Sequence, residues 1–467
     1  IPQMLSHDGP KAAVADVNND GLDDIYIGGT TSKPGVLYIQ NNAGAFLKKD
    51  EEAFKHFSGF VDGAVLFFDC DKDGDMDLLV CAGGNVAAPG SNELQHRLFK
   101  NDGKGNFTAA IQAFPVNKDN IAVATACDFD NDGDQDLFVG ARCVTGVYGL
   151  TPQSHIYIND GNGTFADMPK EKCETVCNAG MVTGAVWADM DGDKMNELVV
   201  VGDWMAPQIF KYTADGFTAV PNTLSDKMGW WQTVAAADLN GDGKQDLILG
   251  NLGENFYLKP GKDNPVKLFL GDFDNNGEQD KIITRTVDGK DKPVFMKGEL
   301  ESQLPMLKKQ NLHHADYAKK SFQELFSKEQ KEKVLIKQVN YSSSCIAYNS
   351  GNGNFTITTL PVAVQLSSVK AILPADINND GKTDLVLGGN EFGFQPQLGR
   401  LDASNGAVLL NDGKGNFVMT SNERSGIDLQ GQVRDIVLLK QQKGPGVLFL
   451  RNNELPQLYS VVKNSSK

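Results

Sequence analysis

The 467-residue chain has 60 acidic and 44 basic residues, which give a formal charge of −16. This balance argues against nucleic acid as a partner, because phosphate binding requires a basic surface. No apolar run approaches the roughly 18 residues that a membrane helix needs, so we expect no membrane insertion. A hydrophobic fraction of 40% and 49 glycines are typical of a folded, turn-rich protein.

An aspartate-rich motif opens the chain and then recurs. Val14-Ala15 is followed by a nine-residue loop from Asp16 to Asp24, and then by the apolar run 25–27. The pattern Asp-x-Asp/Asn-x-Asp-Gly-x-x-Asp returns between short apolar runs, with first aspartates at Asp69, Asp128, Asp189, Asp238, Asp272 and Asp376. Apolar runs of strand length on both sides of a turn predict a strand–loop–strand hairpin.

A second motif follows most of these loops. Asn101-Asp102-Gly103 leads into Phe107, and similar turns run over 159–165, 349–355 and 411–417, with weaker forms at 41–46 and 214–217. Such Asn-Asp-Gly clusters supply the positive φ angles of tight turns, and the phenylalanine begins the next strand. Each unit is therefore predicted to be a four-stranded meander, and tandem units of this kind form the blades of a β-propeller.

The spacing of the motifs predicts an all-β fold, with the whole chain, 1–467, as one β-propeller domain. An average of 60 residues per unit between Asp16 and Asp376 favours eight blades, with seven as the alternative. In this interpretation the Asp272 loop replaces the second turn of the fifth blade. A helical insertion over 298–334, with apolar residues at spacings of three and four, replaces the metal loop of the sixth. Three strand candidates in the tail and one at Met4-Leu5 would close the ring.

The loops have the chemistry of calcium sites. Calcium prefers six to eight hard oxygen ligands, which alternate residues of a tight loop can direct at one centre. The candidate ligands by loop position are Asp16, Asp69, Asp128, Asp189, Asp238, Asp272 and Asp376 at position one; Asn18, Asp71, Asp130, Asp191, Asn240, Asp274 and Asn378 at position three; Asp20, Asp73, Asp132, Asp193, Asp242, Asn276 and Asp380 at position five; the carbonyls of Leu22, Asp75, Asp134, Lys244, Glu278 and Lys382 at position seven; and Asp24, Asp77, Asp136, Glu197, Asp246, Asp280 and Asp384 at position nine.

The loops differ in how fully they keep this pattern. Five keep every ligand type and the glycine at position six, whereas the Asp189 loop has Lys194 there and ends in Glu197, and the Asp272 loop has Asn276 at position five. We expect calcium in the five complete loops and also in these two. An EF-hand is excluded, because its twelfth position needs a carboxylate and here lies in an apolar strand. The seven loops hold 28 of the 60 acidic residues, so multiple structural Ca2+ ions would offset most of the net charge.

Further motifs narrow the resemblance to known families. The repeats are similar to the FG-GAP and VCBS repeats of integrin α-subunit propellers and bacterial surface proteins. The segments 202–207, 229–231, 251–255, 315–318 and 400–404 resemble the propeller module of bacterial cartilage-acidic-protein-like proteins, which often carry an ASPIC/UnbV domain; no such domain is recognisable in this chain. The resemblance implies an exported protein, either extracellular, on the cell surface or periplasmic, although Ile1-Pro2-Gln3-Met4 is no signal peptide.

Three functions are compatible with this sequence. The favoured one is a calcium-stabilised, non-catalytic binding or adhesion module that engages a protein or glycan partner, with Trp204, Trp230 and Trp231 as candidates for sugar stacking or for packing. The alternative is a polysaccharide-active, lyase-like enzyme, for which His313 and His314 are the most visible ionisable pair. The third is a structural subunit that docks through the helical insertion.

Overall fold

Antiparallel strands dominate the computed structural model, which describes residues 8–85 and 87–461. Apart from an inserted sheet, six sheets each contain a meander of four antiparallel strands, and a seventh has three described strands. The first sheet contains β1 (Ala12–Ala15), β2 (Asp24–Ile27), β3 (Val36–Gln40) and β4 (Phe46–Lys49); the second contains β5 (Asp62–Phe68), β6 (Asp77–Ala82), β7 (Arg97–Asn101) and β8 (Phe107–Ala110); the third contains β9 (Asn120–Cys127), β10 (Asp136–Cys143), β11 (His155–Asn159) and β12 (Phe165–Asp167).

The remaining sheets follow the same hairpin order. The fourth contains β13 (Met181–Ala188), β14 (Glu197–Met205), β15 (Gln208–Thr213) and β16 (Gly216–Ala219), with β17 (Gly229–Trp230) added to β14; the fifth contains β18 (Thr233–Ala237), β19 (Asp246–Gly250), β24 (Cys345–Asn349) and β25 (Phe355–Thr359); the sixth contains β26 (Val369–Ala375), β27 (Asp384–Gly389), β28 (Ala407–Asn411) and β29 (Phe417–Thr420); the seventh contains β30 (Gln432–Leu439), β31 (Gly446–Asn452) and β32 (Gln457–Ser460).

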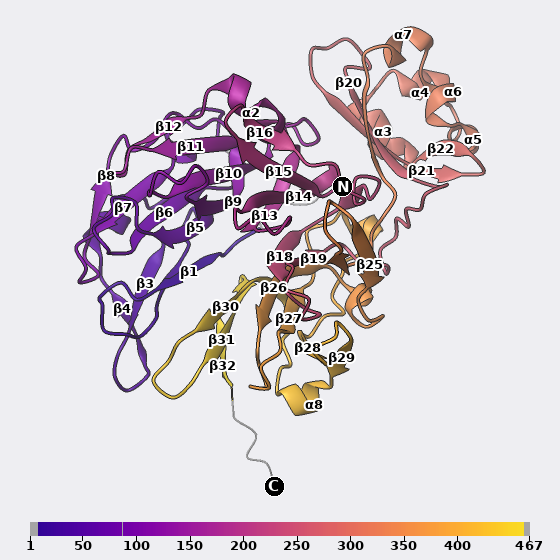
Figure 1. Cartoon of the computed structure of the whole chain (residues 1–467). Coiled ribbons are helices and arrows are strands. Elements are labelled where there is room, and N and C mark those ends of the chain that lie inside the picture. Colours follow the sequence, from indigo (N-terminus) through magenta and orange to yellow (C-terminus); the bar gives the residue numbers. More distant parts are fainter. Residues whose placement is uncertain (1–7, 86, 462–467) are drawn as a thin grey trace.

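The first strands of these sheets pack against one another in chain order. β1 contacts β5, β5 contacts β9, and the series continues through β13, β18 and β26 to β30 (Figure 1). The seventh sheet in turn lies beside the first. Ala12 N donates to the Asp435 carboxylate at 3.0 Å, and Asp23 N donates to the Lys440 carbonyl at 3.2 Å. The predicted meander of four-stranded units is confirmed, and the fold is that of a β-propeller.

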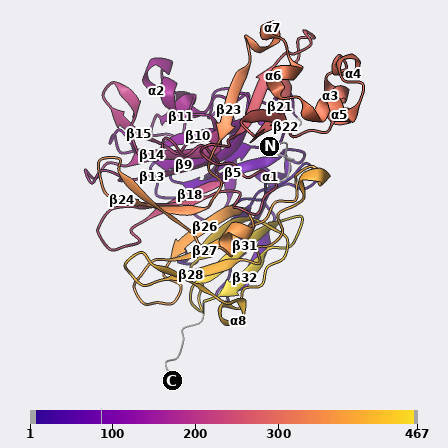
Figure 2. The same cartoon turned by 90° about the vertical axis from the view of Figure 1, so that its right-hand side faces the viewer.

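The segment between β19 and β24 forms an inserted lobe. Its sheet, in the order β22-β21-β20-β23, contains β20 (Val266–Gly271), β21 (Asp280–Val287), β22 (Lys290–Pro293) and β23 (Leu335–Val339). The helices of the lobe are α3 (Lys297–Gln303), α4 (Leu307–Gln310), α5 (His314–Lys319), α6 (Phe322–Leu325) and α7 (Lys328–Lys331). Figures 1 and 2 show this lobe projecting beyond the other sheets.

The inserted sheet is covered on both faces. Phe269 and Phe273 pack against Leu300, Phe322 and other apolar residues of the helices. On the opposite side Val266, Leu268 and Leu270 join a core with Trp204 and Trp230 of the fourth sheet. The helices predicted over 298–334 are thus accompanied by four strands, and the insertion is larger than the helical pattern alone indicates.

Two placements predicted from the spacing are wrong. The Asp272 loop joins β20 to β21 in the inserted sheet and is not the second turn of the fifth sheet. That turn is the Asn349 turn, because β24 pairs with both β19 and β25. The insertion separates Asn349 from the Asp238 loop in sequence, which is why the turn appeared to belong to a sixth unit without a metal loop.

The predicted pairing of the two chain ends falls partly on Met4-Leu5, which lies outside the described residues. The other helices are short connections: α1 (Glu52–Lys55), α2 (Lys170–Cys177) and α8 (Asn422–Ser425), with 3-10 turns η2 (Asn92–Leu94), η3 (Val364–Leu366) and η4 (Pro396–Leu398). Among the described residues, no helix has the length and apolarity needed to cross a membrane.

Candidate functional site

The seven aspartate loops share one backbone conformation. Positions four and six have positive φ in every loop, and position six is glycine in six of them, as at Gly21 with φ 86°. Lys194 adopts φ 74° at this position in the Asp189 loop, a conformation that is unfavourable for a residue with a Cβ. In all seven loops the position-one carboxylate accepts a hydrogen bond from the amide of position six. The repeated sequence pattern therefore specifies a repeated loop geometry.

The position-nine carboxylate forms hydrogen bonds with the backbone. In the Asp69 loop, Asp77 accepts from Cys70 N at 3.0 Å and from Asn101 N at 2.8 Å. The same pair of contacts, to position two and to the end of the third strand, is made by Asp24, Asp246 and Asp384. Burial raises the pKa of Asp24 to about 6 and that of Asp136 to about 7. These buried acids would gain from a nearby cation that favours the ionised form.

In four sheets, an asparagine side chain donates a hydrogen bond to the aspartate loop of the preceding sheet. Asn101 Nδ2 donates to the Val17 carbonyl of the first sheet's loop at 2.8 Å, and Asn159 Nδ2 donates to the Cys70 carbonyl at 2.9 Å. Asn349 and Asn411 make the same contact with Met190 and Leu239 at 2.8 Å each. In the first sheet Gln40 Nε2 donates to the Lys440 carbonyl of the seventh at 3.1 Å.

Four loops bring three acidic side chains close together. The groups are Asp69, Asp71 and Asp73; Asp128, Asp130 and Asp132; Asp189, Asp191 and Glu197; and Asp272, Asp274 and Asp280, in each of which the three ligand oxygens lie within 4.8 Å of one another. Buried oxygens of Asp69, Asp71, Asp128 and Asp274 have no hydrogen-bond partner within the described chain. Converging hard oxygens without partners fit a divalent cation such as calcium.

The other three loops gather fewer carboxylates. The Asp16, Asp238 and Asp376 loops have an asparagine at position three, Asn18, Asn240 and Asn378. Within the described residues, no group of three acidic, histidine or cysteine ligands converges in these loops. Their amide oxygens are hard donors too, but the amides of Asp20 and Asp242 already donate to Asn18 and Asn240 at 3.1 and 2.9 Å.

A lysine lies against the carboxylates of the Asp189 loop. Lys211 Nζ from β15 contacts Asp191, Asp193 at 2.6 Å and Glu197 at 3.2 Å. Burial alone would lower the pKa of Lys211, but its hydrogen bonds to these three acids raise it. The ammonium group thus supplies positive charge where the calcium pattern places a metal ion.

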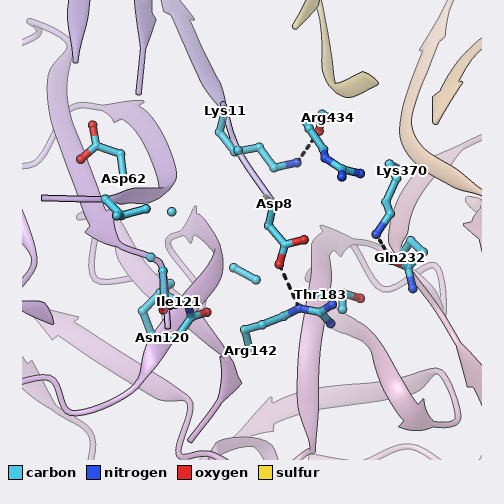
Figure 3. A pocket seen from close by; sticks show the side chains of 16 residues that line it. Asp8, Lys11, Asp62, Asn120, Ile121, Arg142, Thr183, Gln232, Lys370 and Arg434 are labelled. Atoms are coloured by element: carbon cyan, nitrogen blue, oxygen red, sulfur yellow. Dashed lines mark hydrogen bonds and ion pairs between the residues drawn. The ribbon is translucent and has the colours of Figure 1, made fainter. Parts of the chain in front are cut away.

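A small cavity lies at the other end of the first strands. Its volume is about 60 Å³, well below the roughly 300–1,000 Å³ typical of small-molecule sites. Cationic side chains from four different sheets line it, namely Lys11, Arg142, Lys370 and Arg434, together with Asp8 and Asp62 (Figure 3). Lys370 and Arg434 lie near the beginnings of the first strands β26 and β30, whereas six aspartate loops, all except the Asp272 loop, follow the ends of first strands. The cavity and these six loops therefore occupy opposite faces.

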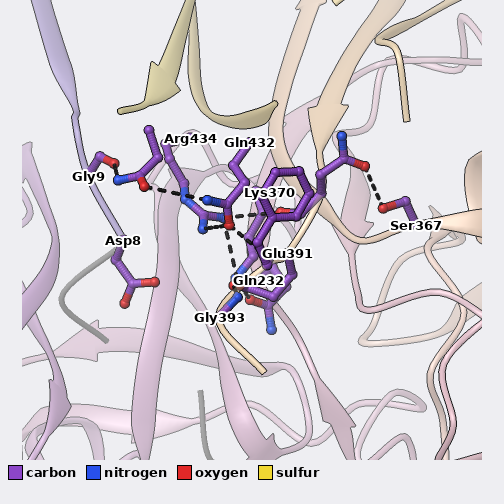
Figure 4. Close-up of polar contacts among 12 residues, drawn as sticks. Asp8, Gly9, Gln232, Ser367, Lys370, Glu391, Gly393, Gln432 and Arg434 are labelled. Atoms are coloured by element: carbon purple, nitrogen blue, oxygen red, sulfur yellow. Dashed lines mark hydrogen bonds and ion pairs between the residues drawn. The ribbon is translucent and has the colours of Figure 1, made fainter. Parts of the chain in front are cut away.

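Buried ion pairs hold three of the four cations around this cavity. Arg142 Nη1 lies 2.8 Å from Asp203 Oδ2. Lys370 Nζ lies 2.8 Å from Glu391 Oε2, which also lies 3.4 Å from Arg434 Nη1 (Figure 4). Burial alone would raise the pKa of Glu391, but Lys370 and Arg434 lower it to about 2. The Arg142–Asp203 pair joins the third and fourth sheets, and the Arg434–Glu391 pair joins the seventh and sixth, so this network connects neighbouring sheets around the centre.

The sequence motifs do not predict the ion pairs around the central cavity. Their visible signal is a charged residue inside an otherwise apolar strand, such as Arg142 in the fully buried β10 or Arg434 in β30. The tryptophans and histidines that the sequence suggested for sugar stacking and catalysis do not form part of this network. Trp204, Trp230 and Trp231 are 4%, 1% and 0% exposed, so they pack in the core and offer no open stacking surface. His313 and His314 are exposed at the start of α5.

Comparison with known proteins identifies the repeats. An FG-GAP-like repeat family matches residues 16–80, 86–139 and 189–249, and an FG-GAP repeat family matches 230–269. These parts of the chain carry FG-GAP-type repeats, as the resemblance implied. The narrower relationship to ASPIC/UnbV-associated proteins stays a prediction.

The chain is also similar to two known proteins. Integrin alpha-8 of Gallus gallus is 37% identical over 93 residues, which are 17% of this chain and 9% of that protein. The chain therefore spans under a tenth of the length of this relative. The crystal structure of the V. cholerae biofilm matrix protein Bap1 has a TM-score of 0.41 and 13% identity, over 98% of this chain and 77% of that chain.

Proposed function

We propose that this protein is a calcium-stabilised, non-catalytic binding module of the adhesion type, built as a closed ring of seven blades. The observation that carries the calcium part is the convergence of buried, unpartnered carboxylate oxygens in the Asp69 and Asp128 loops. There Asp69, Asp71 and Asp73, or their equivalents, would hold the ion. Bound calcium would offset the repulsion between clustered carboxylates and hold the loop in its observed conformation.

The ring closes by contacts like those between its internal neighbours. Gln40 bridges from the first sheet to the Lys440 carbonyl, just as Asn101 bridges to Val17. The inserted sheet lies outside this series, because β19 continues to β24 without it. These contacts support seven blades and assign the additional sheet to the insertion.

The binding role rests on the repeats and on their similarity to part of an integrin alpha chain. We propose an exported protein, located outside the cell, on its surface or in the periplasm, with a protein or glycan as partner. The lyase-like alternative has less support, because three of the four cations at the central cavity are paired with Asp203 and Glu391 and the cavity volume is about 60 Å³.

A two-stage experiment tests this proposal. Anomalous diffraction from calcium-grown crystals should show an ion in the Asp69 and Asp128 loops. The immobilised, calcium-loaded protein should then retain a defined glycan or purified surface protein from an array, and an Asp71→Asn and Asp130→Asn double variant should retain less of it. Absence of calcium from both loops would refute the structural role. Turnover of an acidic polysaccharide by the purified protein would instead favour the enzyme.

A further inference from the structure

One aspartate loop, the Asp272 loop, lies in the inserted lobe, where it joins β20 to β21. It has the internal contacts of the other loops: Asp272 accepts from Gly277 N at 2.9 Å, and Asp280 accepts from Phe273 N at 3.1 Å. The ligand oxygens of Asp272, Asp274 and Asp280 lie within 4.8 Å of one another. Its surroundings differ, because the helices of the lobe pack beside it in place of a neighbouring sheet.

Helix α3 supplies one contact that a strand supplies elsewhere. In five loops of the ring, one oxygen of the position-nine carboxylate accepts from the backbone amide at the end of the third strand, as Asp77 Oδ1 does from Asn101 N at 2.8 Å. In the Asp272 loop, Asp280 Oδ1 accepts instead from Gln303 Nε2, at 3.1 Å. Gln303 is the last residue of α3, so a helix side chain takes the place of the strand amide.

Helix α7 supplies the contact that an adjoining sheet supplies elsewhere. In four loops of the ring, the carbonyl of position two accepts from an asparagine side chain of the following sheet, as Val17 does from Asn101 at 2.8 Å. In the Asp272 loop this carbonyl belongs to Phe273 and accepts from Gln330 Nε2 at 2.7 Å. Gln330 Oε1 also accepts from Ser327 N at 2.9 Å, so one side chain caps α7 and holds the loop.

The side chain of Phe273 adds an apolar link between the loop and the helices. It is fully buried, and its ring centre lies 5.7 Å from that of Phe322, at the start of α6, and 4.5 Å from that of Phe326. Leu300 of α3 belongs to the same apolar cluster. Close-packed interiors transmit small displacements, so a change in the conformation of this loop would reach α3, α6 and α7.

We propose that Gln303 and Gln330 are positioning residues of a calcium site in the Asp272 loop, and that ion binding there orders α3 and α7. The inference rests on the calcium part of the proposed function. Side chains that orient metal ligands typically change metal affinity by about 10–100-fold, and Gln303 bonds directly to the carboxylate of Asp280. The coupling is reciprocal: helices that favour binding of the ion are themselves stabilised when the ion binds. The lobe would thus respond to calcium through its own loop.

Amide hydrogen exchange of the full chain, measured by mass spectrometry in calcium and in EGTA, tests the proposal. Free calcium at ten times its dissociation constant should slow exchange in 297–331 about tenfold, because opening of the helices would release the ion. Asp274→Asn should abolish this slowing but leave the effect of calcium on residues 69–77. The matched substitution at position three of the Asp69 loop, Asp71→Asn, should do the reverse.

The calcium concentration at the midpoint of this slowing tests the two glutamines. Gln303→Leu and Gln330→Glu should each raise it about tenfold. Gln323→Leu is the control: its amide bonds to Asp291 at 2.8 Å in the same lobe but not to the loop, so the midpoint should not move.

Three outcomes would overturn the proposal. Calcium-dependent exchange in 69–77 with none in 297–331 would refute this inference alone. No calcium dependence in either segment of the wild-type protein would contradict the calcium part of the proposed function as well. Midpoints that both glutamine variants leave unmoved would show that the helices do not position the site.

Discussion

The two faces of the propeller balance their charges differently. At the central cavity, Arg142, Lys370 and Arg434 face Asp203 and Glu391, so the chain supplies ions of both signs. At the loop face, 24 acidic residues lie in six loops, and most of their cationic contacts are single and partly exposed, as in the Lys382–Asp380 pair at 3.4 Å. The cavity face has buried partners of opposite charge for most of its cations, whereas the acidic loop face would, under the proposed function, bind ions from outside.

The Asp189 loop shows how these two solutions are related. It keeps the backbone shape of the other loops but has Lys211 against three of its carboxylates. Under the proposed function, the ammonium group of Lys211 takes the place that a metal ion has in the other loops. We therefore expect calcium dependence to be concentrated in the loops without such a lysine.

Calcium removal should give the largest effect. An ion present at about 100 times its dissociation constant stabilises the folded state by about 2.7 kcal/mol per site, and several loops contribute together. Excess EGTA should therefore lower the melting temperature in scanning calorimetry, and added calcium should restore it. Magnesium at the same concentration is the control and should restore less, because it requires stricter geometry. An unchanged melting temperature in EGTA would contradict the proposal that bound calcium stabilises the folded protein.

A substitution in the central network should be nearly as damaging but independent of calcium. Glu391→Gln removes the anion shared by Lys370 and Arg434, and breaking a buried pair in this way typically costs about 3–5 kcal/mol. Urea unfolding should show the same loss with and without calcium. Asp402→Asn is the matched control: its pair with Arg400 is more than half exposed, so we expect at most about 0.5 kcal/mol.

The same network predicts a direction for pH dependence. The pKa of Glu391 is lowered to about 2 from its ordinary 4.5. Its stabilising contribution is therefore complete above pH 4.5 and is lost as the pH falls toward 2. In EGTA, the stability difference between wild type and Glu391→Gln should be constant from pH 5 to 7 and should shrink below pH 4. A difference that grew on acidification would contradict the ion-pair interpretation.

Replacing Lys211, which lies against the Asp189 loop, should allow a metal ion to bind in place of its ammonium group. Lys211→Met leaves Asp191, Asp193 and Glu197 without their ammonium partner, and we expect a loss of about 1–3 kcal/mol in EGTA. In calcium the loss should be smaller, and titration calorimetry should count one additional ion. Lys244→Met is the control, because Lys244 makes one 3.7 Å pair and is 45% exposed. An unchanged ion count would show that this loop cannot hold a metal even without its lysine.

Local pattern was sufficient to predict the repeated parts of the molecule. The Asp-rich loop and the Asn turn each form within one hairpin, so residues such as Asp69 and Asn101 could be placed from their neighbours in sequence. The insertion made the predicted placement of two turns wrong. The aspartate loop at Asp272 and the Asn turn at Asn349 keep their local shape whichever strands they join, so their sequences do not show which sheet they belong to. Long-range contacts were not predictable, because nothing adjacent to Lys211 in sequence identifies Asp191 as its partner.

The smallest expected effect concerns the coupling between neighbouring sheets. Asn411 Nδ2 donates to the Leu239 carbonyl of the fifth sheet at 2.8 Å and to the Thr383 carbonyl of its own sheet at 3.0 Å. Asn411→Ala should cost about 1–2 kcal/mol in urea unfolding, because it leaves buried carbonyls without these donors. Asn354→Ala, whose side chain bonds only within its own exposed turn, should cost less. Since Leu239 belongs to the Asp238 loop, Asn411→Ala should also weaken calcium binding there. An unaltered calcium affinity would show that each loop binds its ion independently of the adjoining sheet, so the acidic face would then be a set of separate sites.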